Sequence, residues 1–164
     1  MAMTLTSPAF EEGERIPAKY TCDGENISPP LKLEAVPEGA ASFALIMEDP
    51  DVPRELHPEG VYDHWVAFNI PAETEVLAEG EVIGLPGKNG RGEQGYRGPC
   101  PPPQYEPKEH RYFFRLYALD RELALPEGAT KDEVLAAMSG HTLATAELMG
   151  RYSRTWSNRN ATML

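Results

Sequence analysis

The sequence has no apolar segment long enough to cross a lipid bilayer and no surplus of basic residues. None of its apolar runs approaches the length of about eighteen residues that a transmembrane helix needs. Fifteen lysines and arginines stand against 26 acids, which gives a formal net charge of −11. A nucleic-acid-binding surface needs cations to replace condensed counterions, and an anionic bilayer repels an acidic chain without a basic amphipathic helix. The composition argues against both partners.

Cysteine is also scarce. The chain has only Cys22 and Cys100, which lie far apart in the sequence. Its first eight residues contain neither the basic stretch nor the apolar core of a secretory signal. We therefore expect a cytoplasmic protein in which both cysteines are free thiols, without a disulfide framework as its main stabiliser.

The common catalytic and metal-binding motifs are missing. There is no phosphate-binding GxxxxGK[ST] loop, no GxSxG elbow, no HExxH pair and no CxxC spacing. We expect no metal and no cofactor. A thiol hydrolase built from Cys100, His110 and Asp49 remains an alternative, although Pro99 and Pro101 beside the cysteine lack the N–H of an oxyanion hole.

Glycine and proline are plentiful, with 14 and 16 residues, and favour short strands joined by turns. Three apolar segments, 42–47, 64–70 and 111–119, have the pattern of strands. Every even position from 112 to 118 is apolar or aromatic, which predicts a core-facing side. In the segment 64–70, simple alternation predicts residues 65, 67 and 69 on one face and residues 66, 68 and 70 on the other.

The segment 84–109 holds six glycines and six prolines in 26 residues. A stretch this long without regular structure is typical of a functional loop. The alternative is a disordered loop, but Tyr96, Tyr105 and the run Gly98–Pro103 favour a functional one. The part from 95 to 102 can also be a rigid connection that ends at the strand 111–119.

The C-terminal region indicates helices. Thr130 and Glu133 form a capping-box pattern, and the apolar spacing after Gly140 predicts a second helix over 141–152. The last fourteen residues carry Arg151, Arg154 and Arg159 and no acids. We predict a single domain over residues 1–164 that is mostly β, with short C-terminal helices.

Two polar clusters are candidate sites. The first is the acidic segment 48–51, followed by His64 at the start of a strand. It fits a solvated turn, or carboxylates that face a cation. The second is the loop 95–102 with His110, where glycine N–H groups and an imidazole can hold a phosphate or carboxylate.

Taken together and in order, the motifs of these clusters resemble the phosphatidylethanolamine-binding protein (PEBP) family. The segment 22–31 resembles its bacterial, Raf-kinase-inhibitor-like branch, and the likeness spans about residues 3 to 160. The motifs that carry it are Asp49-Pro50-Asp51-x-Pro53, His64-Trp65, Tyr96-x-Gly98-Pro99-x-Pro101-Pro102 and His110-Arg111-Tyr112.

The resemblance implies an antiparallel β-sandwich with a small anion-binding pocket at one end. In that pocket His64 and His110 would donate N–H bonds to the anion, Asp49 would orient one imidazole, and Tyr112 would add a hydroxyl donor. Anion affinity should then fall as the pH rises through the histidine range. The expected ligand-binding residues are Asp49, Val52, Pro53, His64, Gly98, Cys100, Pro101, Pro102, His110 and Tyr112.

The function that the resemblance implies is a small-anion-binding protein with a regulatory or inhibitor-like role and no catalysis. Its ligand would be a phosphorylated or carboxylate anion, its protein partner a kinase or a protease, and family precedent allows a homodimer. Two alternatives stay open. One is a hydrolytic enzyme that uses Cys100 or the His64/His110 pair, and the other is an interaction scaffold that acts through the Pro-rich loop.

Overall fold

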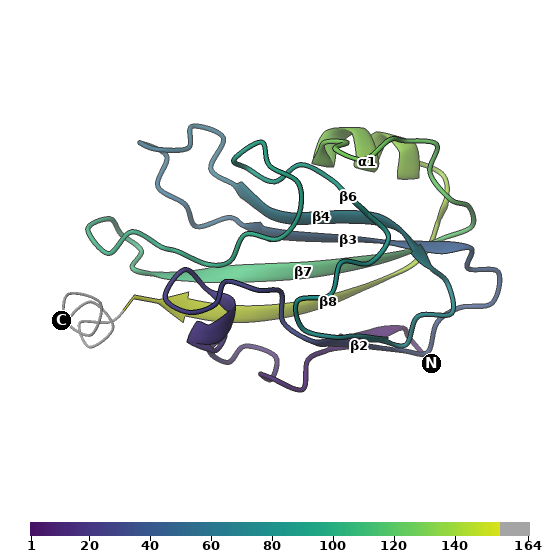
Figure 1. The fold of residues 1–164 in the computed structure, drawn as a ribbon, viewed down its shortest axis with the longest axis horizontal. Helices are drawn as coiled ribbons and strands as arrows, with labels where there is room; N and C mark the ends of the chain where they lie inside the picture. Colours follow the sequence, from purple (N-terminus) through teal and green to yellow (C-terminus); the bar gives the residue numbers. More distant parts are fainter. Residues whose placement is uncertain (155–164) are drawn as a thin grey trace.

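The structure, a computed structural model, describes residues 1–154 and consists of two antiparallel sheets that pack face to face (Figure 1). A five-stranded sheet has the order β6-β4-β3-β7-β8, and a three-stranded sheet has the order β1-β2-β5. The predicted mostly-β sandwich is confirmed. The strands are β1 (Thr4–Thr6), β2 (Leu31–Glu34), β3 (Ser42–Asp49), β4 (Tyr62–Pro71), β5 (Val76–Leu77), β6 (Leu85–Pro86), β7 (Glu109–Leu119) and β8 (Thr142–Ser153); the helices are the 3₁₀ turn η1 (Ala18–Tyr20) and α1 (Lys131–Met138).

The main core fills the space between the two sheets. Strand β7 turns its even-numbered residues inward, and all of them from 110 to 118 are buried, as the alternation predicts. The three-stranded sheet contributes Leu5, Leu31, Leu33 and Leu77 to the same cluster. Alternating burial in both sheets therefore explains the sandwich.

A second, smaller core lies under α1 on the outer face of the large sheet. Val134 and Met138 of the helix pack there against Val66 and Phe68 of β4. The predicted capping box is confirmed by the bonds between Thr130 and Glu133. Among the described residues, no helix is long and apolar enough to span a membrane.

The predicted second helix over 141–152 is wrong, because these residues form most of β8. Leu148 and Tyr152 are buried, and burial alternates along the strand from Ala146 onward. Pairing with β7 extends from Leu119↔Thr142 to Glu109↔Ser153. The inter-strand hydrogen bonds and the inward-facing side chains outweigh the local helical preference.

A bulge at Asn69 corrects the alternation predicted for the segment 64–70. Asn69 has a φ of 52°, and the register of β4 against β3 shifts between Phe43 and Leu45. Ile70 therefore points into the main core with Trp65 and Ala67, and not to the side of Phe68. The Asn69 side chain stabilises the bulge by bonding both the N–H and the carbonyl of Leu123.

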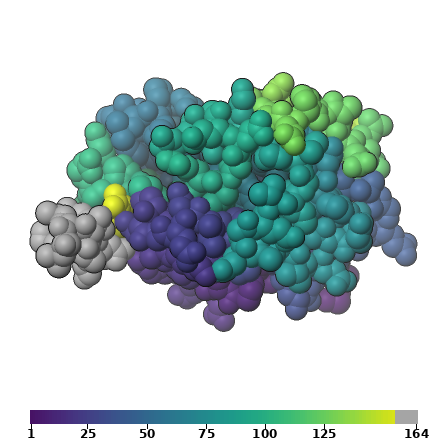
Figure 2. Space-filling model, viewed as in Figure 1, coloured from purple at the N-terminus to yellow at the C-terminus, as the bar shows by residue number. Residues whose placement is uncertain are grey.

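The loop between β6 and β7 covers one face of the sandwich. In Figure 2 the teal residues of this region lie beside the indigo segment that contains η1. Of the C-terminal arginines, Arg151 pairs with Glu109 and Arg154 with Asp23. Arg159 lies outside the described residues, so the single domain over 1–164 stays a prediction.

Candidate functional site

A pocket of about 330 Å³ opens at the end of the sandwich where β3 ends and β4 and β7 begin. The antiparallel register brings Asp49, the last residue of β3, next to the first residues of β4. All ten residues predicted for the anion site line this single pocket. Their convergence is therefore observed, whereas their binding of a ligand stays a prediction.

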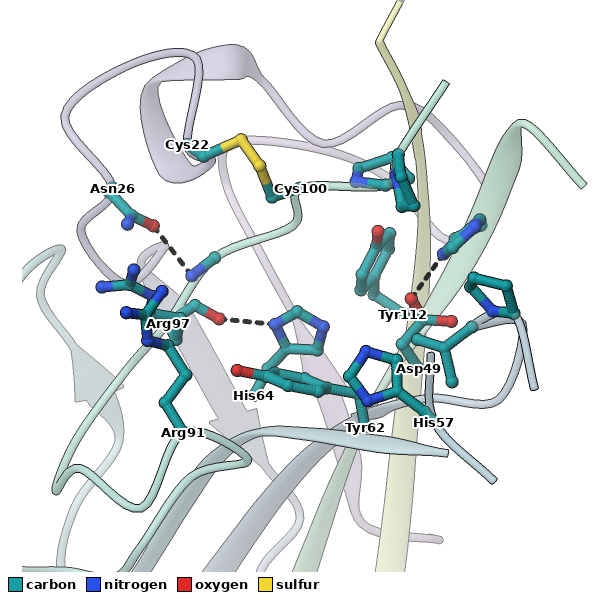
Figure 3. Close-up of a pocket in the computed structure, with 16 residues that line it drawn as sticks. Cys22, Asn26, Asp49, His57, Tyr62, His64, Arg91, Arg97, Cys100 and Tyr112 are labelled. Carbon is teal, nitrogen blue, oxygen red and sulfur yellow. Dashed lines mark hydrogen bonds and ion pairs between the residues drawn. A yellow bond between two sulfur atoms is a disulfide. The ribbon is translucent and has the colours of Figure 1, made fainter. Parts of the chain in front are cut away.

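Asp49 and His110 form a buried pair in the pocket (Figure 3). The His110 Nδ1 lies 2.6 Å from Asp49 Oδ2, and the two side chains are 1% and 2% exposed. The other carboxylate oxygen of Asp49 accepts the backbone N–H of Asp51 at 2.7 Å. Because Nδ1 donates to the carboxylate, Nε2 is the atom that His110 has left for a ligand, and within residues 1–154 it has no hydrogen-bond partner.

The geometry of His64 does not suit the donor role predicted for it. Its Nδ1 donates to the Arg97 carbonyl at 2.6 Å, and burial lowers the pKa of His64 to about 4. The ring is therefore neutral at pH 7, and its Nε2 carries a lone pair. The prediction that His64 donates to an anion does not fit this geometry, since the free nitrogen of the neutral ring is an acceptor.

Tyr112 places a protonated hydroxyl in the pocket. Burial, followed by the negative charge of Asp49, raises the pKa of Tyr112, so the phenol stays protonated. Its hydroxyl faces Asp49, whose acceptor oxygens contribute to the raised pKa, but it completes no hydrogen bond of good geometry within the described residues. A buried hydroxyl without a partner is costly, and a ligand in the pocket can satisfy it.

The three acids at the end of β3 each have a cationic or imidazole partner. Of the two interpretations of this segment, the structure therefore favours carboxylates that face cations over a solvated turn. Glu48 pairs with Arg115 and also with Lys131, at 3.1 Å. Asp51 accepts three bonds from Arg111, which hold the pKa of Asp51 below its usual range. Asp49 is thus the acid of this segment that lines the pocket.

The two cysteines form a disulfide, so the prediction of free thiols is wrong. Cys22 and Cys100 are bonded, with a Cα–Cα distance of 5.4 Å across a sequence separation of 78. The Cys22 N–H donates to the Pro99 carbonyl at 3.1 Å and brings the two loops together. The thiol hydrolase is excluded for this state because Cys100 has no thiolate. The expectation of thiols rested on a cytoplasmic location, which stays a prediction.

The disulfide joins the loop 98–102, which forms one wall of the pocket, and the position of this loop depends on Gly98. A Cβ at Gly98 would lie 2.2 Å from the Tyr20 carbonyl oxygen. The Gly98 N–H donates to Asn26 Oδ1 at 2.8 Å, and the Tyr96 hydroxyl donates to the Tyr20 carbonyl at 2.7 Å. Only glycine allows this close approach, which fixes the loop 98–102 over the pocket.

Comparison with known proteins agrees with this architecture. Residues 6–153 match the family described as phosphatidylethanolamine-binding protein. The chain belongs to the PEBP family. It is 49% identical over 153 residues to a UPF0098 protein of Chlamydia muridarum, and the match covers 93% of this chain and 99% of that protein. It is 51% identical over 159 residues to a UPF0098 protein of Methanothermobacter thermautotrophicus, with 93% and 99% covered.

Solved structures of PEBP relatives have the same fold. A crystal structure of a putative PEBP homolog from Chlamydia trachomatis has a TM-score of 0.89 at 49% identity, covering 94% of this chain and 99% of that chain. The structure of YbcL from E. coli, described as a new member of the mammalian PEBP family, has a TM-score of 0.82 at 28% identity, covering 93% and 99%.

The pocket of this PEBP member contains residues that the motifs did not reveal. His57 packs its ring edge-on against Tyr62, with centroids 5.3 Å apart. Arg91 and Arg97 also line the pocket. Outside the histidines, the lining has two arginines and one aspartate, a formal charge of 2 − 1 = +1 in a chain of −11. Cations within the glycine-rich loop were the sequence signal that could have revealed them.

Proposed function

We propose that this PEBP member binds a small phosphate monoester or carboxylate in the pocket and does not act on it chemically. The observation that carries the proposal is a pair of buried polar atoms in the pocket, His110 Nε2 and the Tyr112 hydroxyl, which complete no hydrogen bond within residues 1–154. Both atoms need a hydrogen-bond partner, and a phosphate oxygen accepts from each.

The monoanion of a phosphate monoester matches the donors and acceptors of this pocket. Its P–OH donates to the neutral His64 Nε2, while its charged oxygens accept from the Tyr112 hydroxyl and from the protonated His110. Asp49 stabilises the imidazolium of His110 through their 2.6 Å contact. Val52 and the prolines of the wall exclude water, which strengthens these bonds.

Ethanolamine phosphate combines an anion with an ammonium group, and the family name points to such a headgroup. The phosphate would meet His110 and Tyr112. The ammonium group would lie toward an acceptor such as His64 Nε2. Phosphate is the chemistry common to these ligands, so methyl phosphate is a sufficient probe.

The absence of catalysis is part of the proposal. With Cys100 in a disulfide, the pocket offers no thiolate nucleophile, and the free nitrogen of His64 is a weak base because burial holds its pKa at about 4. A cytoplasmic, Raf-kinase-inhibitor-like regulatory role, a kinase or protease partner and a homodimer follow from the family resemblance alone.

Isothermal titration calorimetry with methyl phosphate tests the proposal. The wild-type protein should bind, and Tyr112→Phe should weaken binding about tenfold by removing one buried hydroxyl donor. Tyr117→Phe is the matched control, because Tyr117 lies on the opposite face of the same strand and does not line the pocket. Equal losses in both variants, or no binding by the wild type at millimolar ligand, would contradict the proposal.

The same titration has a predicted pH dependence. Affinity should fall as the pH rises from about 6 to about 8, because the ester loses the P–OH that donates to His64 Nε2. His64 stays neutral and Tyr112 stays protonated over this range. A flat profile between these values would contradict the bond from the P–OH of the ester to His64.

A further inference from the structure

Two arginines of the loop 84–109 lie together at the pocket, and only one acid balances them. Arg91 Nε is 3.5 Å and Arg97 Nη1 is 3.9 Å from the same oxygen, Glu93 Oε1. Within residues 1–154, Glu93 is the only acid in ion-pair range of either guanidinium. All three side chains are more than a third exposed, so this shared ion pair is weak.

The backbone holds both arginines in place. Arg97 is tied to His64 twice, because its N–H donates to the His64 carbonyl at 2.9 Å and its own carbonyl accepts from His64 Nδ1. The Arg91 N–H donates to Asn89 Oδ1 at 2.9 Å in a tight turn. The cations therefore project from fixed points of the pocket rim.

Gly90 allows this turn to pack on the pocket wall. Its N–H donates to the Asp63 carbonyl at 2.7 Å, and a Cβ at this position would lie 2.5 Å from Tyr62 Cε2. The missing side chain lets the loop contact the Tyr62 ring, which places Arg91 in the pocket lining. The positive charges of Arg97 and Arg91 oppose the effect of burial on the pKa of Tyr62 and are thus close to its hydroxyl.

The arginine pair is separate from the buried anion site. In Figure 3, Arg91 and Arg97 lie on the side of Asn26, whereas Asp49 and Tyr112 lie across the pocket, with Tyr62 and His64 between the two groups. One small phosphate in contact with His110 and Tyr112 leaves the guanidinium groups free for a second acceptor.

We infer that Arg91 and Arg97 form an outer anion subsite, and that the preferred ligand carries two anionic groups. This inference rests on the proposed function: the first group is the phosphate monoester held by His110 and Tyr112. The second is a phosphate or carboxylate that replaces Glu93 between the two guanidinium groups, which are suited to bidentate bonds with such anions.

The wall between the subsites sets the character of the linker. Tyr62 and His64 have ring centroids 4.7 Å apart, and His57 extends this aromatic surface. Apolar or flat groups in a linker that crosses these rings should raise the affinity of the ligand, and further charges there should lower it. The expected ligand class is therefore a small bisphosphate or phosphorylated carboxylic acid with a short, weakly polar spacer.

Calorimetry with methyl phosphate, ethylene glycol bisphosphate and butanediol bisphosphate tests this inference. For the wild type, at least one bisphosphate should bind about tenfold more tightly than methyl phosphate. The double variant Arg91→Gln/Arg97→Gln should lose that advantage and keep its affinity for methyl phosphate within about twofold to threefold, the residual long-range charge effect. The control Lys32→Gln/Arg121→Gln has the same net charge and changes residues outside the pocket, so it should keep the advantage.

The outcomes separate the inference from the proposed function. If methyl phosphate does not bind the wild type, the proposed function fails and the subsite fails with it. If methyl phosphate binds and no bisphosphate binds more tightly, only the outer subsite is wrong. The subsite is also wrong if the advantage survives in the arginine variant, or if the control variant loses it equally.

Discussion

The Nδ1 nitrogen of His110 and the Oδ2 oxygen of Asp49 are 2.6 Å apart, and both side chains are buried. The pair connects β7 to the end of β3 and leaves Nε2 of His110 as the atom that can meet a ligand. A carboxylate in this position favours the protonated imidazole, and protonation converts Nε2 from an acceptor into a donor. In the proposed site, Asp49 is thus a positioning residue that acts through His110.

The substitution Asp49→Asn should preserve the shape of this pair and remove its charge. We expect the affinity for methyl phosphate at about pH 6 to fall about tenfold, because the imidazolium of His110 loses its stabilising partner. Calorimetry measures the loss. The control is Asp51→Asn, whose carboxylate faces Arg111 instead. Asp49→Asn binding as tightly as the wild type would contradict the assigned role.

Neutral, buried His64 predicts an acid-dependent loss of stability. Its pKa is lowered from 6.5 to about 4 in the folded state, so the unfolded chain binds more protons between these values. Stability should therefore fall as the pH decreases from about 6.5 to about 4, by up to about 3 kcal/mol. The unfolding free energy, measured with guanidinium at several pH values, should show this extra loss in the wild type but not in His64→Gln. The same dependence on pH in both proteins would contradict the prediction.

Removal of the disulfide should destabilise the fold. The bond closes a long loop, with a sequence separation of 78, and such a crosslink contributes about 2–4 kcal/mol. The variant Cys22→Ser/Cys100→Ser should lose this amount in chemical unfolding at neutral pH. Wild type unfolded with a dithiol reductant present should match the variant. An unchanged unfolding free energy in both samples would show that the crosslink contributes nothing.

The bulge in β4 depends on both the backbone and the side chain of Asn69. Asn69→Ala removes two hydrogen bonds to Leu123, of 2.7 and 3.0 Å, and keeps a Cβ at positive φ. We expect a loss of about 2–3 kcal/mol. Asn69→Gly loses the same bonds and tolerates the φ, so it should be more stable than Asn69→Ala by about 1 kcal/mol. Thermal and chemical unfolding distinguish them, and the reverse order would refute this explanation.

Local patterns in the sequence were sufficient to predict the strands that face the core and the helix α1. Strand β7 buries its even-numbered face, so its apolar residues alternate in the sequence. The capping box of Thr130 and Glu133 spans only four residues and can be read locally. The order of the PEBP motifs was sufficient to group Asp49, His64 and His110. Their close approach depends on the pairing of β3 with β4 and β7, which the separate motifs only imply.

The remaining errors come from contacts that are distant in sequence. The segment of β8 has residues with good helical preference, and only its pairing with β7 determines that it is a strand. Cys22 and Cys100 meet where two loops distant in sequence lie side by side, joined also by a hydrogen bond from Cys22 to Pro99. The direction of the His64 ring depends on the carbonyl of Arg97, which no side-chain motif encodes.

A crystal structure of the protein with methyl phosphate bound tests the central claim most directly. The account predicts a phosphate whose oxygens lie within hydrogen-bonding distance of both His110 Nε2 and the Tyr112 hydroxyl, with the 2.6 Å contact between His110 and Asp49 intact. A phosphate bound elsewhere, with these two atoms still lacking a ligand, would contradict it.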